Sequence, residues 1–324
     1  LNTMEHHSIG LDNYRDYPVR ANQPALATVL AEQENLFVVC KGSSRSEIDG
    51  IPPPPEVPEG RVGFSDLPND RDDIVRRHLF NFDQAPTSPC QSSYALNALL
   101  ALNYLESQGY KLTVSPEGEL QAGDIPFKPL EPTGGSYRNV DAGGHQLLFN
   151  YRSLKHPEKI AETVTLTDLL EGKVAPASIR DRIVLIGTTA DSFGDNWQTP
   201  YGQTKGVFMQ AQMVSQLISA VLDNRALITV WPDWREVAWI VFWGSTGSFW
   251  IVALRSSDRP LRKLALGLLV SELALFSLCW LLFAKAHIWV PWIPAAIAPL
   301  AVVSSTPIIY RLSNPPSPKK QESS

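Results

Sequence analysis

The amino-acid sequence predicts a mixed α/β domain, with a largely parallel sheet and flanking helices, followed by three transmembrane helices. Three observations predict this fold class. Strand-like and helix-like segments alternate over residues 1–235, as is typical of α/β domains. Three long apolar segments follow near the C-terminus. The charge also divides there, with 20 Lys and Arg against 29 Asp and Glu up to residue 235, and 8 against 4 after it.

The elements expected in the first 110 residues follow from apolar spacing and from turn-forming residues. Residues 8–11 (SIGL) predict the end of a short strand. Residues 24–34 predict a helix that begins at proline, where a missing N–H costs little. The run NLFVVC at 35–40 is typical of a buried strand. Two strands around an Asp/Asn/Pro turn are expected in 61–80, and a leucine-rich helix in 92–107.

The rest of the first domain is expected to add two strands and two helices. The strands are QLLFNY at 146–151 and RIVLI at 182–186, and the second strand ends at a glycine. A short helix at 165–171 would be capped by Thr165 or Thr167. A longer helix at 207–222 leads toward the apolar segments. Strands interleaved with helices in this way favour a sheet whose strands run largely parallel.

Three apolar segments have the length needed to cross a membrane. Residues 237–254 and 288–310 carry no formal charge, and 264–284 carries one, Glu272. A helix of about 20 residues rises roughly 30 Å, the thickness of the hydrocarbon layer. A buried helical hairpin in a soluble core is the alternative, but three successive segments of this length argue against it. We therefore expect transmembrane helices within 236–312 and a disordered polar tail at 313–324.

Charged residues in the connecting loops predict the orientation of these helices. Lys and Arg gather between the first two segments and in the tail (Arg255, Arg259, Arg262, Lys263, Arg311, Lys319, Lys320). Positively charged loops remain in the cytoplasm, so residues 1–235 are expected outside the plasma (inner) membrane, with a cytoplasmic C-terminus. Six tryptophans fall near the expected outer interface (Trp231, Trp234, Trp239, Trp280, Trp289, Trp292).

An export signal is expected ahead of so large an outer domain. Residues 1–30 contain no apolar stretch of the kind that a signal peptide needs, and the first residue is Leu. We therefore expect that the chain is truncated at its N-terminus and lacks a signal anchor. The alternative is that the segment 237–254 itself carries the preceding domain across the membrane.

Several motifs, in order along the chain, resemble the CHASE type 2 (CHASE2) domain. They are IGLDNYRDYPV at 9–19, NLFVVCK at 35–41, GFSDLPNDRDDIVRRHLF at 63–80, LLFNYRS at 147–153, VTLTDLLEGKV at 164–174, IRDRIVLIGTTADSFGDNWQTPYG at 179–202 and GVFMQAQMVSQLISAVLDNRALI at 206–228. This domain is an extracytoplasmic sensory domain of bacterial, and especially cyanobacterial, cyclases and histidine kinases. The resemblance covers about residues 8–230.

The resemblance implies a sensory domain followed by three transmembrane helices. Members usually begin with a membrane anchor and an initial strand–helix unit, neither of which is present here, and this again indicates truncation. Members also commonly carry a cytoplasmic cyclase, kinase or similar output module. Only a short stretch follows Tyr310 in this chain, so we expect no output domain in it.

The segment IGTTAD at 186–191 is one candidate ligand site. It directly follows a predicted strand, and α/β folds tend to bind ligands at the carboxyl ends of parallel strands. Thr188, Thr189 and Asp191 could supply hydroxyl and carboxylate contacts there. The segment lacks the glycine-rich pattern of a phosphate-binding loop. The alternative is that these residues serve only the exit of the chain from the strand.

Three arginines form a second candidate site. Arg76, Arg77 and Arg152 could bind an anion, because guanidinium groups pair well with carboxylates. In the alternative interpretation, Arg77 pairs with an aspartate of its own predicted hairpin (Asp70, Asp72 or Asp73).

Cysteine and polar residues give two further expectations. Cys40 and Cys90 share the outer domain, where oxidising conditions permit a disulfide, although two unpaired thiols are the alternative. Glu272 lies within a predicted span, where a charge must be neutral, paired or directed into a bundle. It is expected to contact neighbouring helices, with Ser271 or Thr306 as candidate partners.

The predicted function is a sensor that couples an unknown small-molecule or protein stimulus to the cytoplasm through three transmembrane helices. Its expected partners are the membrane, a second copy of the chain, or a separate kinase or cyclase. The alternative is a structural membrane subunit whose outer domain binds another protein. No cofactor, metal site or catalytic constellation is predicted, so we expect no enzyme. The acidic outer domain also argues against nucleic-acid binding.

Overall fold

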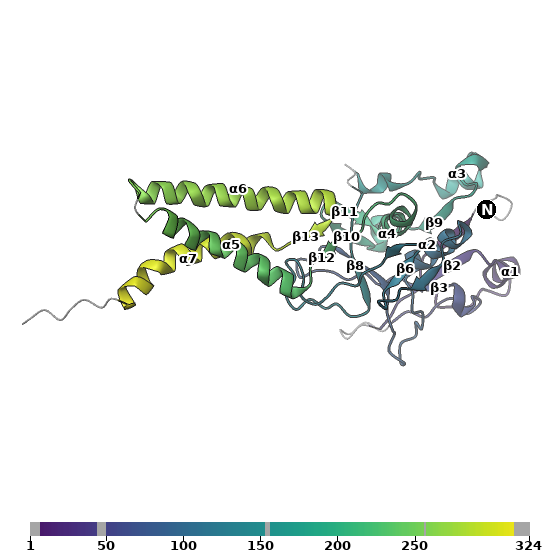
Figure 1. Ribbon diagram of the computed structural model, residues 1–324. Helices are drawn as coiled ribbons and strands as arrows, with labels where there is room; N and C mark the ends of the chain where they lie inside the picture. The colour runs from purple at the N-terminus through teal and green to yellow at the C-terminus, as the bar shows by residue number, and fades with distance from the viewer. Residues whose placement is uncertain (1–6, 44–49, 153–155, 256, 314–324) are drawn as a thin grey trace, which may run out of the picture. The chain divides into compact units, whose positions relative to one another are not determined.

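The computed structural model describes residues 7–43, 50–152, 156–255 and 257–313, and the chain forms two compact units. We call the first unit, residues 1–130 and 141–228, the head. We call the second unit, residues 131–140 and 229–324, the helix unit. Figure 1 shows the elements of both units. Apart from Ser313, the polar tail predicted at 313–324 lies outside the described residues.

A parallel four-stranded sheet organises the head. Its strand order is β3–β2–β1–β9, with bounds Val62–Phe64, Leu36–Cys40, Ser8–Asp12 and Ile183–Gly187. All three strand pairs are parallel, and the helix α1 (Pro24–Glu32) forms the crossover from β1 to β2. The apolar run of β2 is buried along its whole length, as expected for an inner parallel strand. The predicted mixed α/β fold with a parallel sheet is therefore confirmed.

Two long helices pack beside this sheet. They are α2 (Leu96–Ser107) and α4 (Gly206–Leu222), which contact each other and the strands β1 and β9 respectively. Gly10 in β1 permits the close approach, because a Cβ there would overlap side-chain atoms of Leu100 and Leu185. The core between sheet and helices is apolar, with Val38, Phe64, Leu96 and Leu100 fully buried.

Smaller elements complete the head. The antiparallel pairs and the short meander comprise β4 (Arg77–Asn81) with β8 (His145–Leu148), β10 (Asn196–Thr199) with β11 (Gly202–Lys205), and β5 (Leu112–Val114), β6 (Leu120–Ala122) and β7 (Ile125–Pro126). The short helix α3 spans Leu166–Leu170, and Thr165 caps it by accepting a hydrogen bond from the N–H of Asp168.

The two strands expected within 61–80 exist, but they do not form a hairpin with each other. β3 pairs with β2 in the parallel sheet, whereas β4 pairs with β8. The turn between them therefore carries the chain from one sheet to another. The hairpin prediction was wrong because each strand pairs with a strand outside the segment 61–80, β3 with β2 and β4 with β8.

Three helices make up most of the helix unit. They are α5 (Asp233–Ala253), α6 (Pro260–Ala286) and α7 (Trp292–Ser313). Two short strands, β12 (Thr229–Val230) and β13 (Ile288–Trp289), pair in parallel just before α5 and α7. These two helices therefore start from the same end of the unit and run the same way, whereas α6 runs in the opposite direction (Figure 1).

Small residues bring the three helices together. A Cβ at Gly247 in α5 would lie 2.6 Å from the carbonyl oxygen of Pro299 in α7. A Cβ at Gly267 in α6 would lie 2.5 Å from the Trp250 ring. The Trp250 indole N–H also donates a hydrogen bond to Ser271 Oγ in α6, at 2.9 Å.

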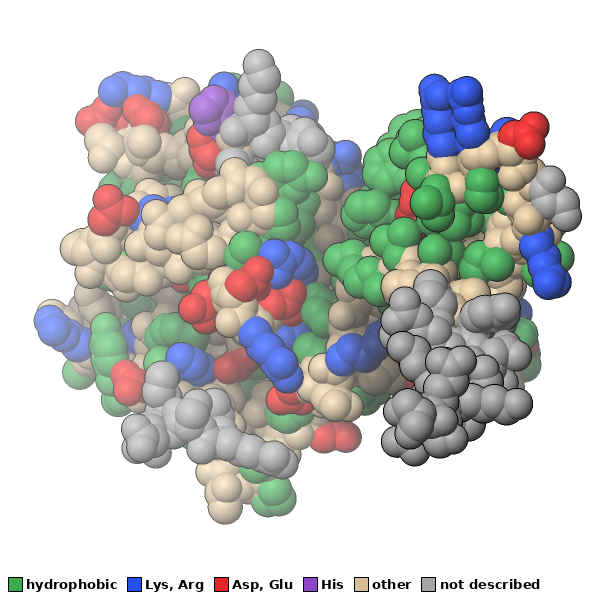
Figure 2. Space-filling view, turned by 90° about the vertical axis from the view of Figure 1, so that its left-hand side faces the viewer, with side chains coloured by type: hydrophobic (Ala, Val, Ile, Leu, Met, Phe, Trp, Pro, Cys, Tyr) green, Lys and Arg blue, Asp and Glu red, His purple; other side chains and the backbone are tan. Residues whose placement is uncertain are grey.

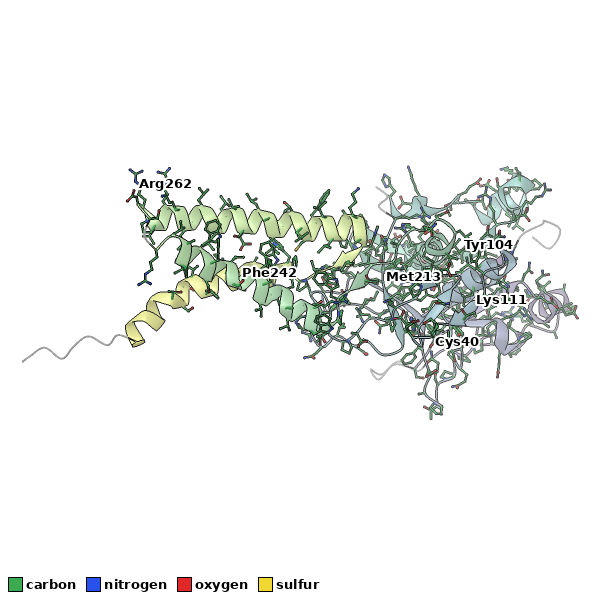
Figure 3. The ribbon with its side chains drawn as sticks, in the orientation of Figure 1. Cys40, Tyr104, Lys111, Met213, Phe242 and Arg262 are labelled. Atoms are coloured by element: carbon green, nitrogen blue, oxygen red, sulfur yellow. A yellow bond between two sulfur atoms is a disulfide. The ribbon has the colours of Figure 1, made fainter. Side chains whose placement is uncertain are left out.

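Among the described helices, α6 alone is both long enough and apolar enough to cross a membrane by itself. The described apolar part of α7, Trp292–Thr306, is shorter. α5 has the length, but its tryptophans and its Gly and Ser residues lower its hydropathy. Figure 2 shows hydrophobic side chains over the helices, and Phe242 of α5 is 60% exposed (Figure 3).

Candidate functional site

Polar and acidic side chains that could bind a ligand lie at the carboxyl ends of the parallel strands. The chain leaves β1 for β2 on one side, whereas β9 pairs with β1 on the other side. Such a switch in strand order leaves a crevice at the carboxyl ends, where α/β folds bind ligands. Asp12 ends β1, Asp66 follows β3, and Thr188 and Thr189 follow β9.

Acidic groups surround the carboxyl end of β1. Burial and, to a smaller extent, the nearby Asp195 carboxylate raise the pKa of Asp12 to about 7. Burial also raises the pKa of Tyr14 to about 12, and the Tyr14 hydroxyl lies 2.5 Å from Ser65 Oγ. Asp66 accepts a hydrogen bond from the N–H of Gly42 at 2.9 Å. Among the described residues, no group of three His, Cys, Asp or Glu side chains is arranged to hold a metal ion.

A pocket of about 290 Å³ lies beyond the carboxyl end of β9. It is lined by residues of the segment after β9, of the β10–β11 hairpin, of α4 and of a short 3-10 helix at 157–160 (Glu158, Thr189, Asp191, Asn196, Gln203, Thr204, Lys205, Phe208). The pocket contains Thr189 and Asp191, two of the three candidates predicted in this segment. Thr188 is half-buried and does not line it.

Lys205 organises the polar side of this pocket. Its ammonium group donates to Asp191 Oδ1 and, at 2.7 Å, to Asn196 Oδ1. The hydrogen bond from Lys205 holds the pKa of the Asp191 carboxyl below its usual range. Thr204 is 7% exposed, and its hydroxyl has no hydrogen-bond partner among the residues that the structure describes.

The start of α4 fixes one wall of the pocket. Asp195 accepts hydrogen bonds from the N–H of Gly206, at 3.0 Å, and from the indole N–H of Trp197, at 2.8 Å. A side chain at position 206 would overlap the Asp195 carboxylate. Glycine therefore lets an aspartate satisfy the first N–H of the helix, where a negative charge is favoured.

Asp195, Thr204 and Lys205 were not identified from the sequence. The signal for the hairpin was present, because Pro200–Gly202 separates two polar strands and marks a turn. The polar alternation in β10 and β11 lacks the apolar residues by which strands are usually recognised.

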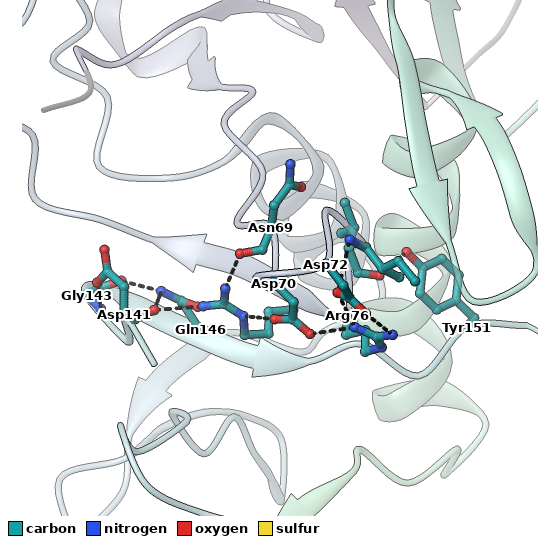
Figure 4. Close-up of polar contacts among 11 residues, drawn as sticks. Asn69, Asp70, Asp72, Arg76, Asp141, Gly143, Gln146 and Tyr151 are labelled. Atoms are coloured by element: carbon teal, nitrogen blue, oxygen red, sulfur yellow. Dashed lines mark hydrogen bonds and ion pairs between the residues drawn. The ribbon is translucent and has the colours of Figure 1, made fainter. Parts of the chain in front are cut away.

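The arginines of the second candidate site have separate partners. Arg77 donates through Nε to Asp70, at 2.9 Å, and through Nη1 to Gln146 Oε1, at 2.7 Å (Figure 4). Arg76 also binds Asp70, at 3.0 Å, and forms a bidentate pair with Asp72. Arg152, the third arginine of the predicted site, instead donates to Ser215 on α4, at 2.6 Å.

These contacts favour the structural interpretation of Arg77. Its side chain is 3% exposed, and the Asp70 side chain is 9% exposed. Asp70 was one of the aspartates considered as its partner, although β4 is not part of a hairpin with β3. An anion site shared by the three arginines stays a prediction, and the described contacts give it no common partner.

A disulfide joins Cys40, at the end of β2, to Cys90, and both residues are fully buried. It ties the central sheet to the segment that leads into α2, across a sequence separation of 50 residues. Of the two alternatives left open by the sequence, the structure has the bonded one.

Glu272 is half-buried on α6. Ser271 accepts its hydrogen bond from Trp250, and Thr306 donates to the carbonyl of Val302 in its own helix. The described residues show no hydrogen bond from Glu272 to either expected partner.

The loop 131–140 connects two parts of the head in sequence but belongs to the helix unit. Residues 131–140 are inserted between β7 and β8, and Glu236 in the first turn of α5 holds them. Glu236 is 3% exposed; its Oε1 accepts the N–H of Gly135 at 2.5 Å, and its Oε2 lies 3.8 Å from the Arg138 guanidinium. Thr133 donates to Asp233 at 3.1 Å.

No sequence pattern indicates this role for Glu236. The residue directly precedes the apolar segment 237–254, so the sequence indicates only that it bounds this segment. Gly135 meets it in a left-handed conformation (φ +61°), against the ring of Trp289. Glycine at this position is therefore required both by the backbone and by the space available.

Comparison with protein-family models gives one match, the CHASE2 domain, over residues 1–249. No curated protein and no solved structure matches the chain. The matched residues include the whole described head, the loop 131–140 and most of α5. The chain therefore belongs to the CHASE2 family, a family of extracellular sensory domains.

Proposed function

We propose that this protein is a membrane receptor whose head receives a stimulus outside the cytoplasm and passes it through three transmembrane helices, α5, α6 and α7. Family membership supports the sensory role. The apolar exposure of α6 and the Arg and Lys residues between α5 and α6 support the membrane placement. A kinase or cyclase, or a second copy of the chain, would read the signal on the cytoplasmic side.

The loop 131–140 is the observation that carries this proposal. The head holds both ends of the loop. The N–H of Leu130 donates to the carbonyl of Gln146 at 2.7 Å, and the carbonyl of Asp141 accepts from Arg77 and from the Gln146 side chain, at 2.7 and 3.0 Å. Glu236 of α5 holds the middle of the loop. A shift of β4 against β8 would therefore pull on the first turn of α5.

This arrangement gives Arg77 and Gln146 a mechanical role. Both side chains are buried, and both bind the same carbonyl at the point where the loop re-enters the head. A ligand that changes the head by even a small displacement would bias the packing of α5 against its neighbours. Two packings of comparable free energy are sufficient for such a population shift.

The test measures helix packing while the loop is altered. In a Cys279→Ala background, Gly244→Cys and Ala298→Cys form a reporter pair, because a Cβ at 244 would lie 3.3 Å from that of Ala298. This spacing is close to that of a disulfide. The measured quantity is the rate of oxidative cross-linking in the full chain reconstituted in lipid.

Two variants address the two attachments of the loop. Glu236→Gln keeps an acceptor for Gly135 but removes the charge that faces Arg138, and Gln146→Met removes the anchor in the head. We expect each to change the cross-linking rate about threefold or more, and hydrogen exchange in α2 verifies that the head is folded. Arg235→Gln is the control, because Arg235 is exposed and its described contact is with the Trp234 ring. Unchanged rates in both loop variants would refute the proposed coupling.

A further inference from the structure

The pocket beyond β9 presents hydrogen-bond donors on one side. Lys205 uses two of its three ammonium N–H groups on Asp191 and Asn196. Since Asn196 accepts from Lys205 through Oδ1, its amide nitrogen keeps two N–H groups that have no partner among the described residues. The Thr204 hydroxyl, 7% exposed, lacks a partner within the same part of the chain.

An unpaired buried hydroxyl is a costly feature for a fold to keep. A buried polar group without a partner costs on the order of 1–3 kcal/mol. Thr204 lines the pocket, and neighbouring atoms cover its hydroxyl, so a molecule bound there would supply the missing hydrogen bond once a neighbouring side chain turns aside. This separates the pocket from the Arg77 cluster, where buried polar groups bind one another.

Hydrogen-bond acceptors stand on the other side of the pocket. Asp191 is 93% exposed, so its carboxylate keeps lone pairs for a ligand beside the one that Lys205 uses. The Glu158 carboxylate, 49% exposed, is a second acceptor in the lining. Phe208 adds an apolar surface.

The charges of the lining exclude simpler ligands. A plain anion would be attracted by Lys205 but repelled by the Asp191 and Glu158 carboxylates. A plain cation would be attracted by those carboxylates but repelled by Lys205, and a neutral polyol would pair with neither charge. A molecule with a carboxylate and an ammonium group satisfies both sides, and about 290 Å³ suits a small one.

We propose that this pocket binds a small zwitterion, of which a free α-amino acid is the simplest case. The carboxylate would accept from Lys205, Asn196 and Thr204, and the ammonium group would donate to Asp191 and Glu158. A side chain of the ligand would lie against Phe208. This inference rests on the proposed sensory function and names the chemical class of its stimulus.

The first experiment measures ligand binding to the full chain in detergent. Each of the twenty L-α-amino acids is tested by thermal shift and then by calorimetry. Propionate and ethylamine serve as the two halves of alanine, and corresponding halves are used for any other amino acid that binds. We expect at least one amino acid to bind, and each half to bind at least tenfold more weakly. Failure of all twenty, equal binding of a half molecule, or preferential binding of glycerol or glucose would overturn the proposal.

The second experiment assigns the binding to this pocket. Thr204→Val removes the unpartnered hydroxyl with little change of shape, so the head should be as stable as before, or more so. We expect it to weaken binding about fivefold, and Lys205→Gln to weaken binding at least tenfold. Binding that is unchanged in both variants would place the ligand elsewhere and contradict the assignment.

Ser8→Ala is the matched control for these variants. Ser8 Oγ is also buried and unpartnered among the described residues, but it lies at the amino end of β1, opposite the pocket. Its replacement should leave the affinity unchanged. The cross-linking test of the loop needs no ligand, so the proposed coupling and the proposed ligand class can each fail alone.

Discussion

The helices α4 and α6 distribute polar and apolar side chains in opposite ways. α4, in the head, buries twelve residues, among them Gln210, Gln212 and Gln216. α6, in the helix unit, buries Gly267, Ser271 and Leu275, while most of its large apolar side chains are exposed. The glutamines of α4 have buried polar partners, whereas α6 presents leucines to its surroundings.

The partners of the glutamines explain the first pattern. The segment after β8 runs beside α4 outside any regular sheet, and its backbone needs hydrogen bonds. Gln216 accepts from the N–H of Asn150 at 3.1 Å and donates to the carbonyl of Leu148 at 3.0 Å. Gln212 accepts from the N–H of Arg152 at 3.1 Å. Polar side chains thus replace strand pairing in the core of the head.

The proposed membrane placement of the helix unit accounts for this difference. In the head, water outside favours apolar burial and every buried polar group needs a partner. In the helix unit, small residues make the contacts and large apolar residues face outward, as expected for helices that pack in lipid. The following predictions test this contrast.

The largest effect is expected at the disulfide. Replacing Cys40 and Cys90 together by alanine releases a loop with a sequence separation of 50 and should cost the head about 4 kcal/mol in free energy of unfolding. Chemical unfolding of the full chain, followed by hydrogen exchange in α2 and separately in α6, measures it. A loss of protection in α6 equal to that in α2 would contradict the separation of the units.

Leucine truncations in the two units should differ strongly. Leu100 is fully buried against the sheet, so Leu100→Ala should destabilise the head by about 3 kcal/mol. Leu273 on α6 is 58% exposed, so Leu273→Ala should change stability by less than about 0.5 kcal/mol. The same unfolding measurement compares them, and comparable losses would show that the exposed face of α6 is buried against protein.

Acid should destabilise the head through His78. This residue is fully buried, and its Nε2 lies 2.5 Å from Asn97 Oδ1, while burial lowers its pKa to about 4. The unfolded chain takes up the proton near pH 6.5 and the folded chain only near pH 4. Stability from this group is therefore complete above about pH 6.5 and is lost as the pH falls to about 4, by roughly 3 kcal/mol.

A variant isolates this contribution. The raised pKa of Asp12 acts in the opposite direction, because the folded chain binds that proton from about pH 7 downward. His78→Gln keeps a donor for Asn97 and removes the titrating ring. The pH profile of unfolding should be flatter in this variant between pH 6.5 and 4. Identical slopes in the variant and the original chain would show that folding does not lower the pKa of His78.

A smaller effect is expected where α5 meets α7. Gly247→Val should push the helices apart and cost about 2 kcal/mol, because its side chain would meet the Pro299 backbone. The rate of cross-linking between cysteines at 244 and 298 reports the loss of packing. Ser248→Val, at an exposed neighbouring position, is the control and should leave the rate unchanged. Equal rates in both variants would count against this contact.

The sequence predicted the parallel sheet because its strands are apolar runs flanked by helix signals. β1, β2, β9, α1 and α4 lie within one or two residues of the expected bounds. It did not predict the β10–β11 hairpin, whose strands are polar, or the partners of β3 and β4, which depend on contacts distant in sequence.

The candidate site was predictable only in part for the same reason. Thr189 and Asp191 follow a recognisable strand, so their place at its carboxyl end could be inferred. Lys205 and Thr204 reach the same pocket through a hairpin whose turn is marked in the sequence but whose polar strands are not. Likewise, Glu236 and Gly135 are a hundred residues apart, and no local signal joins them.

Cysteine labelling from outside the cell measures on which side of the membrane the head and the α5–α6 connection lie. Single cysteines replace Glu117, exposed in the β5–β6 turn, and Ser257, between α5 and α6, in a Cys279→Ala background. Sealed spheroplasts are treated with a membrane-impermeant maleimide before and after permeabilisation. With the head outside the cytoplasm, Glu117→Cys should react in sealed cells, and Ser257→Cys should react only after permeabilisation. Reaction of both in sealed cells, or of neither, would contradict an extracytoplasmic head joined to the cytoplasm by membrane-spanning helices.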